Sequence, residues 1–429
     1  MPRPLLPTGL RLPRAGLRRD LWISTADAVA YAVMVGCGET YLPAFALALG
    51  LGPVAAGMMA SVPILFGAVM QLVTPFGVAR LGSNRAWVIA CTVIQALSFV
   101  PLVWWALRGE ARLGELLAAA GVYWSAGMAG SPAWNSWIGT LVPRGTRTAF
   151  FAQRNRLTQF GIFVGFVLGG LLLQLGESCG FVLQAFAALF VVAALFRLLS
   201  TACLCACREP KPPQPAAAAA TSLPVRIVRA CRAIAARPSG ALVGFLCGFV
   251  FGAQFAAPYF TPYMIDEMGF SYHAFMLVVA TSFLAKAATL PILGRLASRI
   301  GSLGLMWAAV LAIVPLSLLW LPSANVAYLV GVQVLAGTCW AAYELSVSLS
   351  FFDAVDDAER TTTVTVYNLG LALATVTGAA CGGLLLRTLG EDRTAYAAVF
   401  AASAVLRLAA LPLLQVLSRR LATPLRAPD

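Results

Sequence analysis

Twelve long apolar runs constrain this chain more than any other feature of its sequence. A helix needs about 20 apolar residues to cross the roughly 30 Å hydrocarbon core of a bilayer, because lipid satisfies no backbone polar group. The runs therefore predict an all-α membrane protein with twelve transmembrane helices. Their bounds are 22–48, 53–79, 86–107, 114–141, 149–175, 180–203, 239–264, 272–296, 302–321, 324–352, 361–388 and 393–418. Only 11% of the residues are charged, against about a quarter in soluble proteins, which excludes a water-soluble globular protein.

The positions of the basic residues explain the net charge of +13 and predict the orientation. Of the 30 Lys and Arg residues, 23 fall in the segments at one side of the predicted spans and four at the other, Arg108, Arg112, Arg387 and Arg393. Basic residues collect on the cytoplasmic side of a membrane. Both termini are therefore predicted to be cytoplasmic. This placement, without a nucleic-acid-binding motif, indicates a lipid bilayer as the partner and no nucleic acid.

One long connection divides the chain into two sets of six spans, over residues 1–203 and 239–429. The connection, residues 204–238, begins as a Pro/Ala spacer. In its second part Arg226, Arg229 and Arg232 recur every third residue between apolar residues. This pattern predicts either a short amphipathic helix on the cytoplasmic surface or a solvated basic linker.

The two sets of spans carry matching residues, which indicates an internal duplication. At a shift of 219 residues, Pro43, Gly50, Arg80 and Gly82 fall on Pro262, Gly269, Arg299 and Gly301. At a shift of 213, Arg147 falls on Arg360 and the segment 169–173 reproduces 382–386. One longer loop around residues 107–116 accounts for the difference between the two shifts.

This organisation resembles the major facilitator superfamily of secondary transporters, and the resemblance covers the whole chain. The most specific segment, Gly294-Arg295-Leu296-Ala297-Ser298-Arg299-Ile300-Gly301, is similar to the family's loop motif. In the family the motif arginine forms a clamp at the cytoplasmic side. In this chain Ser298 and, in the first half, Ala79 replace the motif's acidic residue. The resemblance implies a clamp role for Arg80 and Arg299. The predicted cytoplasmic gate consists of these two residues together with Asp27, Arg147, Arg154 and Arg360.

Glycines in the fifth span resemble a second family pattern, that of the antiporters. Gly161, Gly165, Gly169 and Gly170 follow one another at about four-residue spacing, which allows another helix to approach closely. Phe166 stands where the antiporter motif has proline. The partial match favours exchange over symport, and helix packing is the predicted role of the glycines themselves.

Charged residues inside spans are candidate functional residues, because burying a charge in a bilayer is costly. Counted from the cytoplasmic ends, Lys286 and Glu344 lie at similar depths, so they are predicted to pair. In the family, spans one, four, seven and ten line a central cavity. Glu344 is therefore a candidate for binding a proton or a cationic group, with Lys286 as its counter-charge. A static ion pair that only fixes helix packing is the alternative.

Three further groups of polar residues lie in other spans. Glu39, just before Tyr41 and Pro43, is a candidate for proton exchange or a residue hydrated at the outer mouth. Asp27 is predicted to form a structural gate pair with Arg154 or Arg147. Arg197 and Arg407 are expected to extend toward the cytoplasmic surface.

Aromatic and amide residues in the cavity-lining spans predict a site for an amphipathic solute. The candidates in spans four, seven and ten are Trp134, Asn135, Gln254, Tyr259, Trp340 and Tyr343. Lipid-facing or interfacial packing is the alternative for each aromatic ring.

The chain lacks the residue patterns of an enzyme. His273 is the only histidine, which excludes paired-histidine metal sites, and no Walker lysine follows a glycine-rich loop. We therefore expect no cofactor and no metal. The sequence predicts a monomeric secondary transporter of a bacterial inner membrane that exports a small amphipathic solute in exchange for protons. Proton-coupled uptake is the alternative direction, and a transport-dead sensor or scaffold is the alternative from another class.

Overall fold

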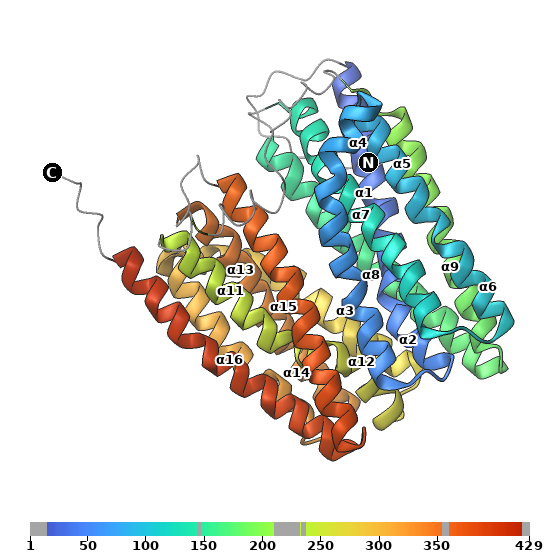
Figure 1. The fold of residues 1–429 in the computed structure, drawn as a ribbon, viewed down its shortest axis with the longest axis vertical. Coiled ribbons are helices and arrows are strands. Elements are labelled where there is room, and N and C mark those ends of the chain that lie inside the picture. The colour runs from blue at the N-terminus through green and yellow to red at the C-terminus, as the bar shows by residue number, and fades with distance from the viewer. Residues whose placement is uncertain (1–14, 144–146, 210–231, 233–236, 354–359, 423–429) are drawn as a thin grey trace.

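Every regular element of the computed structural model is a helix, within the described residues 15–143, 147–209, 232, 237–353 and 360–422 (Figure 1). This confirms the all-α fold class. The first half contains α1 (Ala15–Cys37), η1 (Glu39–Tyr41), α2 (Leu42–Ala48), α3 (Gly52–Met70), η2 (Gln71–Val73), α4 (Thr74–Leu81), α5 (Asn84–Leu97), α6 (Phe99–Arg108), α7 (Leu113–Leu141), α8 (Arg147–Cys179) and α9 (Val182–Ala206). The second half contains α11 (Pro238–Gln254), η4 (Ala257–Tyr259), α12 (Phe260–Pro262), η5 (Tyr263–Glu267), α13 (Tyr272–Ile313), η6 (Val314–Trp320), α14 (Val326–Asp353), α15 (Arg360–Leu389) and α16 (Arg393–Ala422).

Ten helical stretches among the described residues are long and apolar enough to cross a membrane. One of them, 272–320, has 49 residues, about twice the length that a bilayer core requires. Its helix α13 is broken at Gly301, whose φ of 75° and ψ of 171° are not helical. The other missing span is α7, which has 29 residues but is not among the ten stretches that are apolar enough. Dividing α13 at Gly301 and adding α7 gives the twelve predicted spans. The predicted basic helix within 225–237 lies outside the described residues, apart from Arg232 and Arg237.

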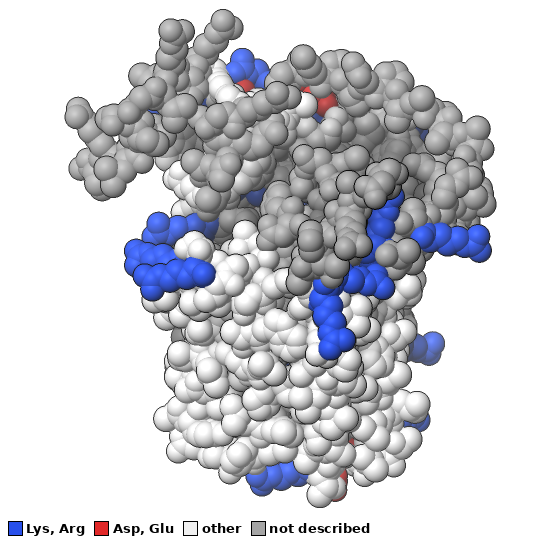
Figure 2. Space-filling model, turned by 90° about the vertical axis from the view of Figure 1, so that its left-hand side faces the viewer, with Lys and Arg blue, Asp and Glu red and all other residues white. Residues whose placement is uncertain are grey.

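The helix ends define two ends of the molecule. We name the end at which α4, α7, α9, α14 and α16 finish the basic end, and the opposite end, at which α2, α6, α8 and α15 finish, the far end. Figure 2 shows a broad uncharged belt between lysine and arginine side chains near the basic end and a few charged side chains at the far end. A belt of this kind is the surface expected to face lipid.

Spans one and seven are interrupted at the same place. A 3-10 segment ends at Tyr41 in the first half and at Tyr259 in the second. The Tyr41 hydroxyl donates to the carbonyl oxygen of Phe166 and the Tyr259 hydroxyl to that of Ala379, both at 2.6 Å. The shift from Phe166 to Ala379 is the 213 residues of the duplication. Each broken span is therefore held to a neighbouring span by an equivalent tyrosine.

The apolar cores show where the two halves meet. One core contains buried residues of both halves, including Phe166, Leu173, Tyr259, Phe275 and Met276. The two other cores each belong to a single half and lie toward the basic end. Between halves, α8 packs on α13 and α3 packs on α15. The halves are therefore sealed together from the far end to the middle of the molecule and separate toward the basic end.

The predicted close packing at the span-five glycines is confirmed. A Cβ atom at Gly161 would meet Ala32, and one at Gly165 would collide with the backbone oxygen of Val33, both in span one. Gly169 lies against the ring of Tyr41, whereas Gly170 lies against Met276 of the other half.

Replacing Gly165 by alanine is expected to lower the midpoint of thermal unfolding, because a backbone carbonyl in rigid helix α1 cannot move aside. Overpacking of this kind costs about 1–3 kcal/mol. Gly331→Ala is the matched control, since a Cβ atom at Gly331 has open space around it. Equal midpoints for the two purified variants would contradict the packing role.

Candidate functional site

The candidate site is built around an ion pair between Lys286 of α13 and Glu344 of α14. The Lys286 Nζ lies 2.7 Å from Glu344 Oε1, which confirms the predicted pairing. The Glu344 side chain is 55% exposed and the Lys286 side chain 26% exposed. The pair is therefore partly exposed, unlike the Asp27–Arg154 pair, whose side chains are 4% and 14% exposed.

The position of Lys286 on α13 shows what the pair faces. Phe275 and Phe283 of the same helix contact the ring of Phe166 in the first half. Lys286 follows Phe283 by three residues, so it lies on nearly the same face, one turn closer to the basic end. Lys286 therefore lies one turn beyond the last of these ring contacts between the halves.

An aromatic cluster lies beside Glu344 on α14. Trp340 packs edge-on against Tyr343, with ring centroids 5.5 Å apart, and both rings pack on Phe249 of α11. Tyr343 is buried, and its hydroxyl has no hydrogen-bond partner among the described residues. Trp340 and Gln254 are half-buried, and Asn135 of α7 is exposed. The cluster gives the carboxylate an apolar, aromatic neighbourhood.

Two of the predicted cavity aromatics have other roles. Tyr259 is 1% exposed and its ring lies in the seal against Gly57, so the prediction that it contacts solute is wrong. The ring of Trp134 lies beneath the guanidinium of Arg154, at 4.2 Å from its centroid. Helix α11 of span seven ends at Gln254, and the 3-10 segment that follows places Tyr259 against Gly57 of the other half.

A second carboxyl group lies in the break of span one. The Tyr123 hydroxyl of α7 donates to Glu39 Oε2 at 2.7 Å and also lies 3.2 Å from the sulfur of Met34. No basic residue forms an ion pair with Glu39 in the described part of the chain. A carboxyl group held only by a neutral hydroxyl in an apolar environment can bind a proton without losing a salt bridge.

The predicted pair between Asp27 and Arg154 is also confirmed, at 3.2 Å between Arg154 Nη2 and Asp27 Oδ2. The other oxygen of Asp27 accepts a hydrogen bond of 2.7 Å from Ser200 of α9. Ser200 accepts in turn from Arg197, whose guanidinium lies over the ring of Tyr31 at 5.0 Å. These groups form a buried network that joins α1, α8 and α9.

The prediction that Arg197 and Arg407 extend to the surface is wrong. Arg197 is 7% exposed and Arg407 is 3% exposed. Arg407 donates to the carbonyl oxygen of Ile313 and to the hydroxyl of Ser403. Ser200 and Ser403, one turn away on the same helix as each arginine, and the Ile313 carbonyl of a neighbouring helix supply acceptors inside the bundle. Both guanidinium groups are therefore held in the interior.

Comparisons with known proteins agree with this architecture. The family model described as Major Facilitator Superfamily matches residues 28–271 and, in a second match, 241–428. The chain belongs to the major facilitator superfamily. A search of curated protein sequences finds no match. As a member of this superfamily, the chain is a secondary transporter rather than an enzyme.

Solved structures of superfamily members show the same fold. A bacterial homologue of the human lysosomal transporter Spinster, inward-facing and unoccupied, is 18% identical with a TM-score of 0.66, over 96% of this chain and 98% of that one. The nucleoside transporter NupG is 13% identical with a TM-score of 0.63, over 95% of this chain and 99% of that one.

The superfamily's loop motif occurs at the basic end in both halves. Arg80 and Arg299 each precede a glycine with positive φ, Gly82 at 65° and Gly301 at 75°. Both arginines are exposed, and neither forms an ion pair with a carboxylate among the described residues. Arg147 and Arg360 begin α8 and α15, but their side chains lie outside the described residues. With the basic end separated, the predicted clamp is not engaged.

A group of contacts at the basic end of the first half was not predicted from the sequence. Asp20 is buried and pairs with Arg208 at 2.8 Å, and the backbone oxygen of Arg208 accepts from the indole of Trp137. The carboxylate of Glu209 accepts from Ser83 and from the backbone of Asn84. These contacts hold the start of the long connection to the first half. Only the proximity of Asp20 to the first span could have indicated its burial.

Proposed function

We propose that this transporter exchanges protons for a small amphipathic solute that carries a positive charge. The observation that carries the proposal is the partly exposed Lys286–Glu344 pair, which lies beside the Trp340 and Tyr343 rings along α14 and one turn beyond the Phe283–Phe166 contact between the halves. A protonated or cation-bound Glu344 would release Lys286. Proton and solute then compete for one carboxylate, which is the requirement for exchange.

Glu39 supports a proton pathway through the first half. Its carboxyl group lies in the break of span one and is held by the neutral Tyr123 hydroxyl. Protonation there leaves no basic side chain unpaired. Uptake by symport remains the alternative direction, in which Glu39 carries the proton inward while Glu344 binds the solute.

The distribution of arginine supports a cytoplasmic basic end, with both termini inside. In this orientation the structure represents an inward-facing state, as in the Spinster homologue that it resembles. An identity of 13% to NupG supports the fold but not nucleosides as the solute. The arginine-rich composition supports a bacterial inner membrane as the location, and we propose a monomer.

The first experiment would measure proton flux into liposomes that contain purified protein and a pH-sensitive dye. Pooled amphipathic amines, organic anions and sugars would be added to the wild type, Glu344→Gln and Glu39→Gln, with Glu110→Gln as the control, since Glu110 is exposed at the far end and pairs with Arg108. We expect flux with amines that falls at least about tenfold in Glu344→Gln, because an amide cannot exchange a proton.

Three outcomes would contradict the proposal in different ways. Flux with organic anions or sugars alone would exclude a cationic solute. Solute uptake that is equal in all variants would exclude coupling through these carboxylates. If neither protons nor solute crossed the membrane although each variant is folded, a transport-dead sensor or scaffold would be favoured.

A further inference from the structure

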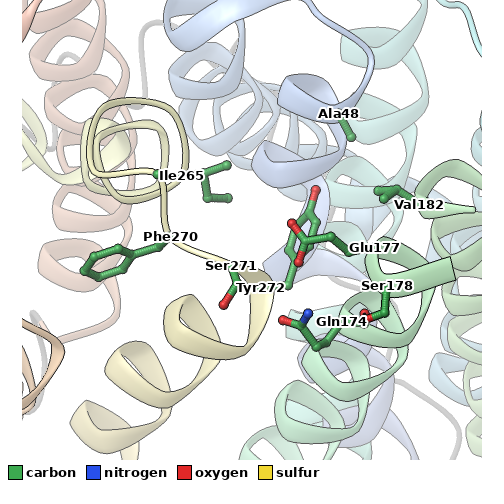
Figure 3. A pocket seen from close by; sticks show the side chains of 10 residues that line it. Ala48, Gln174, Glu177, Ser178, Val182, Ile265, Phe270, Ser271 and Tyr272 are labelled. Carbon is green, nitrogen blue, oxygen red and sulfur yellow. Dashed lines mark hydrogen bonds between the residues drawn. The ribbon is translucent and has the colours of Figure 1, made fainter. Parts of the chain in front are cut away.

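A cavity of ≈ 580 Å³ lies at the far end between the two halves (Figure 3). The first half contributes the ends of α2, α8 and α9, and the second half contributes η5, the start of α13 and the loop between them. The cavity is therefore separated from the Lys286–Glu344 pair by the packed seal. Its volume lies within the range of about 300–1,000 Å³ that is typical of small-molecule sites.

Two polar groups that face this cavity have no partner among the described residues. The first is the carboxylate of Glu177 on α8, which extends into the cavity in Figure 3. The second is the hydroxyl of Tyr272, a residue that is only 7% exposed, yet whose hydroxyl makes no hydrogen bond. Figure 3 shows the Tyr272 side chain beside the Glu177 carboxylate, although the two residues belong to different halves.

Two backbone donors in the first turn of α13 have acceptors among the described side chains. The N–H of His273 donates to the side-chain oxygen of Gln174 at 2.9 Å, across the two halves. The N–H of Ala274 donates to the hydroxyl of Ser271 at 3.3 Å. An anion would find these donors occupied and a carboxylate beside them. The chemistry of the cavity thus favours a cation.

We propose that this far-end cavity binds a small organic cation, an ammonium group with an apolar body. The ammonium would pair with Glu177 and donate to the Tyr272 hydroxyl, while Ile265, Val182 and the ring of Tyr272 surround the body. Both halves contribute to the cavity only while the far end is closed. A bound cation therefore stabilises the state that is open at the basic end, and inhibits transport from a site distinct from Glu344.

Binding of 2-phenylethylamine to the full chain in nanodiscs tests the site, with 3-phenylpropionate as an anionic probe of similar shape. We expect the amine to raise the unfolding temperature saturably and the carboxylate to leave it unchanged. In Glu177→Gln the affinity should fall at least about tenfold, since the charged partner is lost. It should fall less in Tyr272→Phe, which keeps the ring, and stay unchanged in Glu110→Gln.

The variant Glu344→Gln distinguishes amine binding in the far-end cavity from amine binding at the Lys286–Glu344 pair. Retained amine binding in Glu344→Gln, together with lost binding in Glu177→Gln, supports the far-end site. The reverse pattern, equal binding of the carboxylate, or no saturable binding by the wild type would each overturn it.

Discussion

Replacing Arg154 by alanine is expected to destabilise the folded protein by about 3–5 kcal/mol, the cost of leaving a buried charge unpaired. The Asp27 side chain is 4% exposed, and Arg154 supplies its one ion pair within the described part of the chain. Without Arg154 the carboxylate keeps the hydrogen bond from Ser200, and the nearby Arg197 guanidinium donates to that hydroxyl rather than to the carboxylate. Unfolding of the purified protein in mixed micelles, followed by circular dichroism, measures the loss.

Arg156→Ala is the matched control, because Arg156 is exposed two residues further along α8. The double variant Asp27→Asn with Arg154→Ala should lose less stability than Arg154→Ala alone, since no charge then remains buried. If Arg154→Ala were as stable as Arg156→Ala, the pair would not be structural. Asp27 would then become a candidate for contact with solute.

Sequence alone predicted the spans and the two ion pairs because both follow from one-dimensional rules. The length of each apolar run determines the number of membrane crossings. Depth counted along a helix placed Lys286 near Glu344 and Asp27 near Arg154, and these pairs occur in the structure. Such a count needs no knowledge of which helices touch, because a buried charge requires a partner at its own depth.

Errors arose where the partner is supplied by tertiary packing. Arg407 is buried because a carbonyl oxygen at residue 313 lies beside it, and no sequence pattern connects those positions. Tyr259 was assigned to the solute cavity because its span lines that cavity in the family. At the duplication's shift of 219 residues Tyr41 falls on Phe260, one residue past Tyr259, so the sequence register did not pair the two tyrosines. Their equivalence follows from the structure, in which each ends a 3-10 segment and donates to a neighbouring span. Equivalent buried tyrosines indicate a repeated structural contact rather than a solute site.

The far-end seal and the separated basic end together represent one of the two states that a transporter of this fold requires. The broken spans one and seven place Tyr41 and Tyr259 in the seal, and each ring is fixed by a hydrogen bond within its own half. The rings therefore act as rigid surfaces. Opening the far end has to separate the halves along these surfaces.

Replacing Gly57 by leucine is expected to reduce transport at least about tenfold by preventing closure of the far end. A Cβ atom at Gly57 would collide with the ring of Tyr259. This ring is held in place because its hydroxyl donates a hydrogen bond to the Ala379 carbonyl oxygen and lies against Gly383. The free energy of the state with a closed far end rises. The state with an open far end has no such collision, so the population shifts toward it. Spin labels at Glu110→Cys and Arg387→Cys, one in each half, should report a longer distance than in the parent protein. Gly114→Leu is the control, since a Cβ atom there meets no neighbour; an unchanged distance and unimpaired transport in Gly57→Leu would show that this contact does not limit closure.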